Sequence, residues 1–369
     1  MTAQSWRRCP VSTTHDRPAR PTGSVVMVDV AREAGVSQKT VSRVVNDSPQ
    51  VRPEVRERVL AAIDRLGYRR NGAARALAAG RTHLIAIVAM GSPLYGISEH
   101  VIGAERAARE RGYSTVVVAT GEDGDDSEVR RAIDRALALG AEGLLLVEPF
   151  RRDPALLVPY ADVPVVSPQH GDAPDADRSP LHSHVTTDEE HGGRLAAEHL
   201  LDLGHRRVAH LAGPRAWQPA ELRELGWRSA LEGAGAPVVE PVRGDWSARS
   251  GYQAAQELLD RGESFTALFA ANDAMAVGAV RALVERGLGV PRDVAVVGFD
   301  DLPESEFQVV PLSSVRQDFQ AMARLSVEHI VCALEGQPVE RRRVDVRASL
   351  VVRASSGDRR EAPGDAPAP

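Results

Sequence analysis

The chain has 369 residues, of which 43% are apolar, so it can bury several hydrophobic cores and we expect two or three domains. No apolar run approaches the length of a membrane span, and the first 24 residues hold no hydrophobic stretch like that of a secretory signal. The two cysteines, Cys9 and Cys332, lie far apart, which indicates a reducing compartment without a disulfide framework. We therefore expect a cytoplasmic protein with no membrane partner.

The net charge of −6 is unevenly distributed. Residues 1–82 contain 15 Lys+Arg against 7 Asp+Glu, a net charge of +8, which leaves −14 for the remainder. A basic N-terminal part followed by an acidic remainder is typical of a protein that contacts a nucleic-acid phosphate backbone with one end of its chain. We interpret residues 1–25 as a disordered arm or as an over-extended start, with true initiation near Met27.

Residues 26–46, VMVDVAREAGVSQKTVSRVVN, predict two short helices around a glycine turn. Gly35 supplies the left-handed conformation of the turn, and Ser37 is a candidate N-cap for the second helix. Apolar and small residues on both helices form a small core, so the polar residues of the second helix face outward. This arrangement is that of a helix-turn-helix whose second helix can enter a major groove. The outward-facing residues are Gln38, Lys39, Thr40, Ser42 and Arg43.

A third helix is predicted over Pro53–Leu66, with proline in its first turn, an apolar stripe and Gly67 at its end. Tyr68 can close the small core, so the three-helix head spans residues 26–70. The helix-prone segment that follows, within residues 71–82, is too short to be stable alone in water. We expect it to act as a hinge helix and linker.

From residue 83 onward, apolar strands alternate with amphipathic helices, which indicates parallel sheets with helices on both faces. The expected strands are Leu84–Ala89, Ser114–Ala119, Gly143–Val147, Val163–Ser167, Val208–Ala212, Ala267–Ala270 and Val294–Gly298. The expected helices are Ser98–Arg111, Glu128–Ala138, Glu189–Leu203, Pro219–Glu232, Ser247–Arg261, Asp273–Arg286 and Phe319–Leu334. The alternation of strands and helices starts afresh near residues 185–190, which predicts two α/β lobes with a ligand cleft between them.

Seven blocks along the chain resemble, in order, the lactose-repressor (LacI/GalR-type) family of bacterial transcription regulators. The blocks are DVAREAGVSQKTVSRVVN, RERVLAAIDRLGYRRN, EHLLDLGHRRVAHLAGP, GDWSARSGY, FAANDAMAVGAVRAL, VAVVGFDD and PLSSVRQDF. The resemblance implies a helix-turn-helix head and a two-lobed, Rossmann-like effector domain of the periplasmic-binding-protein type over residues 83–355. Its N-lobe would comprise about 83–187 and 319–346, and its C-lobe about 188–315 and 347–355. Residues 356–369 have the composition of a disordered tail.

For the head, the resemblance implies that Gln38, Lys39 and Arg43 approach base edges, because Arg and Lys suit guanine and Gln suits adenine. Ser37, Thr40, Ser42 and Asn46 are better suited to phosphate contacts, which position the protein on the duplex. In relatives the hinge helix, matched here by Asn71, Ala74 and Leu77, orders on operator DNA. Its leucine then opens a base step in the minor groove, and Leu77 stands at that position. The alternative for Leu77 is a linker helix whose leucine caps the first lobe.

The resemblance also implies an effector pocket that suits a mono- or disaccharide, because paired polar groups bind vicinal hydroxyls and an aromatic face stacks on a sugar ring. The acidic neighbours Asp273 and Asp301 are equally explained as caps of helices or loops. At two positions the chain departs from the family pattern, and both departures weaken the assignment of a galactoside as the effector. The chain offers Gln169 where a sugar-contacting Asp is frequent, and Asp123 lies near a position that is Arg in the lactose repressor. The matching positions are Gln169, Arg223, Trp246, Asn272, Asp300, Gln317 and Phe319.

Seven of the eleven histidines fall between residues 170 and 210, and His182, His184 and His191 could in principle chelate a metal. Because other histidines of this group belong to a block that matches the family, we expect no metal and no cofactor. No nucleophile elbow or phosphate-binding loop is present, so we do not expect an enzyme.

We therefore predict a homodimeric, nucleoid-associated transcription regulator that acts as a repressor. It would read a pseudo-palindromic operator and respond to a sugar. One alternative is a family regulator that answers mainly to a protein partner or to a phosphorylated metabolite. Another is a stand-alone sugar-binding protein of the periplasmic type, which shares the two-lobed fold.

Overall fold

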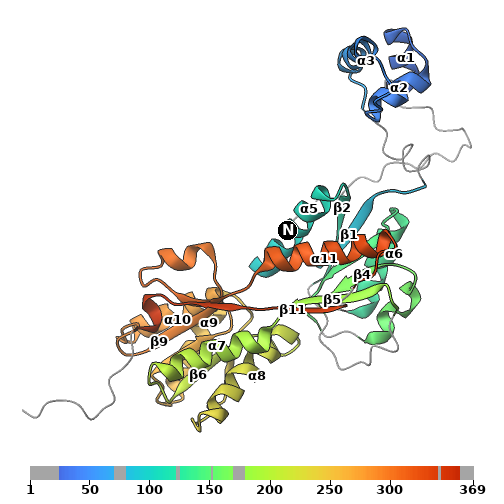
Figure 1. Cartoon of the computed structure of the whole chain (residues 1–369). Helices are drawn as coiled ribbons and strands as arrows, with labels where there is room; N and C mark the ends of the chain where they lie inside the picture. The colour runs from blue at the N-terminus through green and yellow to red at the C-terminus, as the bar shows by residue number, and fades with distance from the viewer. Residues whose placement is uncertain are drawn as a thin grey trace, which may run out of the picture. The chain divides into compact units, whose positions relative to one another are not determined.

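The computed structural model describes residues 25–69, 80–121, 125–150, 153–168, 179–339 and 342–357. Contacts divide the chain into two compact units, residues 1–79 and residues 80–369. In Figure 1 the first unit carries the labels α1 to α3, and the second carries all the strands. Within the described ranges, no helix combines the length and the apolar character needed to cross a bilayer.

The first unit is a three-helix head made of α1 (Met27–Ala34), α2 (Gln38–Val45) and α3 (Pro53–Leu66). Gly35 ends α1 with φ 63°, the left-handed conformation expected at the turn. Ser37 caps α2 by accepting a hydrogen bond from the backbone N–H of Thr40 at 3.1 Å. Buried valines and alanines of all three helices form one core, against which Tyr68 packs. The helices predicted for this unit are therefore confirmed.

The second unit contains two lobes, each built on a six-stranded sheet. The first sheet has the order β11-β5-β4-β3-β1-β2 and the second the order β12-β10-β9-β8-β6-β7. All pairs are parallel except β10 with β12, which is antiparallel. The first sheet comprises β1 (Leu84–Met90), β2 (Ser114–Thr120), β3 (Gly143–Val147), β4 (Val165–Ser167), β5 (His182–Thr187) and β11 (Arg343–Val346). The second comprises β6 (Val208–Ala212), β7 (Val242–Arg243), β8 (Ala267–Ala270), β9 (Ala295–Asp300), β10 (Ser313–Arg316) and β12 (Ser349–Val351).

Helices cover both faces of each sheet, as expected for strands that read as continuous apolar runs. In the first lobe, α5 (Tyr95–Glu110) and α11 (Phe319–Leu334) pack in one hydrophobic cluster, and α6 (Asp126–Ala138) packs in another. In the second lobe, α7 (Glu189–Asp202) and α8 (Gln218–Gly233) share one cluster, while α9 (Ala248–Asp260) and α10 (Asp273–Glu285) share the opposite one. Short 3-10 helices are η1 (Pro154–Tyr160), η3 (Pro303–Phe307) and η4 (Ala354–Ser356).

The predicted helices and strands of the second unit are present, with ends that shift by a few residues. The largest shift is at α5, which begins at Tyr95 rather than Ser98. Five strands, β5, β7, β10, β11 and β12, have no counterpart among the predicted strands. These strands matter for function because the chain passes from one sheet to the other after β5, after β10 and after β11. The residues that follow β5 and β10 belong to the pocket described below.

Candidate functional site

In the head, α2 presents a polar face from which Lys39 and Arg43 project, one helical turn apart. Gln38, Lys39, Arg43 and Asn46 are exposed, whereas Thr40 and Ser42 are half-buried. Within residues 25–69, neither Lys39 nor Arg43 forms an ion pair. Other charges of the head are paired, for example Arg65 of α3 with Glu33 of α1 at 3.1 Å. The predicted base-reading residues therefore lie on one face with unpaired positive charge.

The hydroxyl of Ser37 also contacts the hydroxyl of Thr40 at 2.9 Å, so both side chains help to begin α2. This local role does not exclude a phosphate contact, because a hydroxyl has further hydrogen-bonding capacity. The predicted hinge residues Asn71, Ala74 and Leu77 lie outside the described residues, as do Gln169 and Asp123.

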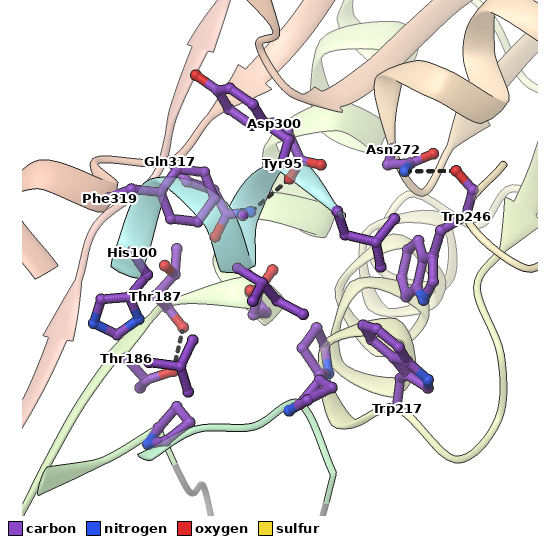
Figure 2. A pocket seen from close by; sticks show the side chains of 18 of the residues that line it. Tyr95, His100, Thr186, Thr187, Trp217, Trp246, Asn272, Asp300, Gln317 and Phe319 are labelled. Atoms are coloured by element: carbon purple, nitrogen blue, oxygen red, sulfur yellow. Dashed lines mark hydrogen bonds between the residues drawn. The ribbon is translucent and has the colours of Figure 1, made fainter. Parts of the chain in front are cut away.

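In the second unit, a cavity of about 330 Å³ receives side chains from both lobes. Six of the seven predicted effector residues line it: Arg223, Trp246, Asn272, Asp300, Gln317 and Phe319. Figure 2 shows Trp246 and Asn272 on one side of this pocket and Phe319, His100, Thr186 and Thr187 on the other. Residues drawn from α5, α8, α10 and the ends of β5, β9 and β10 thus meet in one place.

Arg223 is a buried cation that lines the pocket. Its Nε donates to Glu189 at 2.7 Å, its NH1 donates to the carbonyl oxygen of Ala271 at 2.5 Å, and its NH2 lies 3.6 Å from Asp300. Its guanidinium also lies over the ring of Phe299, 3.8 Å from the centroid. Each nitrogen of the guanidinium therefore faces a protein partner.

Asp300 occupies a strained turn at the end of β9, where Asp300 and Asp301 both have positive φ (98° and 52°). Asp301 is held by ion pairs to Arg316 and to Arg353 at 2.5 and 2.6 Å. Asp273 reinforces the same turn from inside by accepting hydrogen bonds from the Leu302 N–H and from two serine hydroxyls. Neither residue is a local cap: Asn272 caps α10, Asp273 accepts from groups far along the chain, and Asp301 forms ion pairs. Both instead support the turn that carries Asp300.

Asp300 accepts a hydrogen bond from the amide of Gln317 at 2.7 Å (Figure 2). Burial, together with the carboxylates of Asp273 and Glu189, raises the pKa of Asp300 to about 7, although Arg223 and Gln317 oppose this change. Burial likewise raises the pKa of Asp273 to about 6. The pocket therefore holds a carboxyl group that changes its charge near neutral pH.

A carboxyl whose pKa is raised on folding binds a proton that the unfolded chain has already lost, so its contribution to stability falls as pH rises from about 4 to about 7. We expect the Asp300→Asn variant, which resembles the protonated acid, to lose less stability over this interval than the wild type. Urea unfolding at a series of pH values measures the difference. Groups that both proteins share, such as the buried histidines with their lowered pKa and Asp273 with its raised pKa, contribute to both profiles and largely cancel in the difference. Parallel profiles would contradict the assignment.

Trp246 is buried and has a positive φ of 75°, which is unusual for a tryptophan. The side-chain amide of Asn272 donates to the Trp246 carbonyl oxygen at 3.1 Å, and the Asn272 Oδ1 caps α10. Gly213 makes room for the indole, because a Cβ atom there would lie 2.3 Å from the Trp246 ring. Asn272 thus has a structural role in holding Trp246, and one of its amide hydrogens remains for a further contact.

The pocket also contains residues that the sequence analysis missed, above all Tyr95, His100, Glu148, Glu189 and Trp217. Tyr95 packs edge-on against Phe319 with centroids 5.9 Å apart, and Trp217 packs against Trp246 at 5.4 Å. The scarcity of tryptophan, four residues in the chain, was a signal that could have identified Trp217. No comparable signal marks His100 or Glu148, because each reads as part of an ordinary helix or strand end.

The three histidines that suggested a metal site each contact a different partner. His182 contacts the carbonyl oxygen of Tyr160, His184 contacts the hydroxyl of Ser167, and His191 contacts Arg194. Across the part of the chain that the structure describes, no three histidine, cysteine or acidic side chains gather as metal ligands would.

Two family models match this chain. The model for bacterial regulatory proteins of the lacI family matches residues 26–71, and the model for a periplasmic binding protein-like domain matches residues 197–356. The lactose operon repressor of Escherichia coli (strain K12) is 36% identical over 318 residues, which cover 86% of each chain.

Solved structures similar to this chain come from the same group of regulators. A lac repressor dimer bound to operator and the anti-inducer ONPF superposes with a TM-score of 0.82 at 34% identity, covering 90% of this chain and 99% of that one. A complex of the transcriptional regulator CelR with cellobiose gives a TM-score of 0.65 at 36% identity, with the same coverage. The head, the two lobes and the pocket between them are thus accompanied by whole-chain similarity, and the chain belongs to the lacI family of bacterial regulatory proteins.

Proposed function

We propose that this protein is a sequence-specific DNA-binding transcription regulator, acting as a repressor, whose operator affinity depends on a neutral sugar bound between its two lobes. The observation that carries this proposal is the combination in one chain of an unpaired basic recognition face with a polar, aromatic pocket between two lobes. The match of residues 26–71 to a DNA-binding family favours this function over a stand-alone sugar-binding protein. We propose binding and not catalysis for the pocket.

The charge of the pocket favours a neutral effector over a phosphorylated one. Among the described lining residues, Glu148, Glu189 and Asp300 are acidic, and Arg223 is the one Lys or Arg side chain. The guanidinium of Arg223 is already engaged by Glu189, Asp300 and a carbonyl oxygen. A phosphate brought here would face carboxylates at close range in a poorly solvated site, which is unfavourable. Hydroxyl groups, in contrast, can donate to these carboxylates and accept from Gln317 or Asn272.

Thermal unfolding in the presence of D-ribose, lactose, cellobiose or glucose 6-phosphate tests this preference. A ligand that binds the folded protein raises the unfolding midpoint in proportion to RT ln(1 + [L]/Kd). We expect at least one neutral sugar to raise the midpoint and glucose 6-phosphate to leave it unchanged. A shift with glucose 6-phosphate alone would favour the phosphorylated-metabolite alternative.

For the head, we propose that Gln38, Lys39 and Arg43 read base edges while Ser37, Thr40, Ser42 and Asn46 contact phosphates. Asn71, Ala74 and Leu77 stay in the proposal as hinge residues, on the family resemblance alone. Ligand binding can alter operator affinity only through a different affinity for two orientations of the lobes. The sugar would therefore act by favouring one orientation and so changing the spacing of the two hinge segments of a dimer.

Selection from a pool of random duplexes, followed by gel shift, should yield an imperfect palindrome as the preferred site. We expect Arg43→Ala to weaken binding to that site by about 1–3 kcal/mol, because one base-edge contact is lost. Arg65→Ala, which removes an exposed arginine of α3 that pairs with Glu33, is the matched control and should bind as the wild type does. Equal losses in the two variants would show that only overall charge matters.

We propose a homodimer formed through apolar side chains that the single chain leaves exposed. Phe307 is 80% exposed and Val309 is fully exposed, both between β9 and β10, and Ile102 of α5 and Val277 of α10 are also exposed. Large apolar side chains that a single chain leaves exposed are suited to burial against a partner subunit. We expect Phe307→Glu to convert the dimer to a monomer in sedimentation analysis. Val158→Glu, a change at another exposed apolar residue, in η1, should leave the dimer intact.

A further inference from the structure

Trp217 lies where the two lobes meet beside the pocket. It precedes α8 of the second lobe, and its backbone forms an isolated antiparallel bridge with Phe150, which follows β3 of the first lobe. The Phe150 ring packs edge-on against the indole of Trp217, with centroids 5.6 Å apart and planes at 64°. The first lobe therefore contacts Trp217 through both backbone and side chain.

The beginning of α8 is also held by the first lobe. The N–H of Gln218, the first residue of α8, donates to the carbonyl oxygen of Pro149 at 3.0 Å. Because α8 has no side-chain cap, this carbonyl satisfies one of the N–H groups that a helix leaves open at its start. The same helix carries Arg223, so an element that lines the pocket begins on a contact with the opposite lobe.

Trp217 also packs against Trp246, with ring centroids 5.4 Å apart and planes at 57°. Both residues line the pocket, and Figure 2 shows their indoles close together on one side of it. Trp217 is half-buried, whereas Phe150 is 9% exposed and is not among the described residues that line the pocket. Phe150 would thus affect a ligand through its neighbours, and the ring that it contacts is that of Trp217.

We propose that Phe150 is a positioning residue of the pocket, which holds the indole of Trp217 beside Trp246 from the opposite lobe and so keeps two aromatic walls in place for the sugar. This proposal rests on the sugar effector proposed above. A side chain that is already fixed loses less conformational freedom when the ligand binds, which favours binding. An aromatic pair changes an equilibrium constant by about two- to tenfold, and this range sets the expected effect.

Phe150→Ala should weaken sugar binding by about three- to tenfold in calorimetry with whichever of lactose, cellobiose or D-ribose binds the wild type. Leu156→Ala is the matched control. Leu156 is buried and lines the same small cavity of the first lobe as Phe150, and it too is not among the described residues that line the sugar pocket. Both variants should lower the thermal midpoint, because each removes a buried apolar side chain, but only Phe150→Ala should change sugar affinity.

A double-mutant cycle tests whether Phe150 acts through Trp217. Trp217→Ala should itself weaken sugar binding, and in that background Phe150→Ala should cause no further loss, since the ring that it positions is gone. Additive losses, an unchanged affinity in Trp217→Ala, or equal losses in Phe150→Ala and Leu156→Ala would overturn the role of Phe150 while leaving the sugar effector intact.

Tryptophan fluorescence tests the same contact without a ligand. Release of Trp217 should move the emission of Phe150→Ala to longer wavelength, and this shift should be absent when Phe150→Ala is combined with Trp217→Phe. If none of the three sugars binds the wild type, the effector proposal fails, and the emission of these variants alone then decides whether Phe150 positions Trp217. An emission that Phe150→Ala leaves unchanged would contradict the positioning role in either case.

Discussion

Arg223→Met is expected to lower the free energy of unfolding of the unit formed by residues 80–369 by about 3–5 kcal/mol. The reason is that the substitution leaves the buried carboxylates of Glu189 and Asp300 without the cation that lies between them. It also removes a donor to the carbonyl oxygen of Ala271 and the contact with the Phe299 ring. Urea unfolding followed by circular dichroism measures the change.

Arg228→Met is the matched control, because Arg228 lies on the same helix but pairs with Glu224 near the surface. Exposed pairs of this kind contribute about 0–1 kcal/mol, so this variant should unfold almost as the wild type does. Adding Glu189→Gln to Arg223→Met should recover part of the loss, since one uncompensated carboxylate is removed. Equal costs for the two single variants would show that Arg223 is not the electrostatic centre of the pocket.

Trp246→Ala is expected to abolish the response to sugar while leaving operator binding in place. The indole forms one wall of the pocket, and an aromatic face is the part of the protein that suits the apolar face of a sugar ring. Because Trp246 also belongs to the core of the second lobe, the variant should be less stable by about 3–5 kcal/mol. Operator binding is measured by gel shift, with and without the sugar that binds the wild type.

A pair of milder variants separates the pocket from the core. Trp246→Phe and Trp227→Phe both shorten a buried tryptophan, but only Trp246 lines the pocket. Trp227 donates its indole N–H to the carbonyl oxygen of Val208, so its replacement should cost stability and leave sugar affinity unchanged. Trp246→Phe should weaken sugar binding. A normal sugar response in Trp246→Phe and Trp246→Ala would remove this residue from the pocket.

The head could be predicted from the sequence almost residue by residue. The bounds of Pro53–Leu66, the cap at Ser37 and the left-handed turn at Gly35 agree with the structure. These features depend on contacts between residues close in the chain: the apolar spacing of one helix, a hydroxyl three residues from the N–H it accepts, and a glycine at the turn. The alternation of apolar strands and helices in residues 83–355 likewise reflects local patterns.

Strands with polar sequences could not be predicted in this way. The strand β5 reads HSHVTT, yet all six residues are buried. Its histidines are satisfied by Tyr160 and Ser167, which lie about twenty residues earlier in the chain. In β10, Ser313 and Ser314 are fully buried because Ser355 and Asp273 supply their partners. Nothing local to these segments indicates that their polar groups would find such partners.

For the pocket, the family resemblance supplied six residues that the structure brings together, although their role as effector ligands stays a prediction. The sequence by itself determined the three helices and basic face of the head, the α/β character of the lobes and the family. Only the tertiary structure decided that Asp301 and Asp273 support Asp300, that Asn272 holds Trp246, and that Tyr95 and Trp217 line the same pocket. The physical reason is that burial, charge pairing and hydrogen bonding of these groups depend on residues far apart in the chain, which only the folding of the two lobes brings into contact.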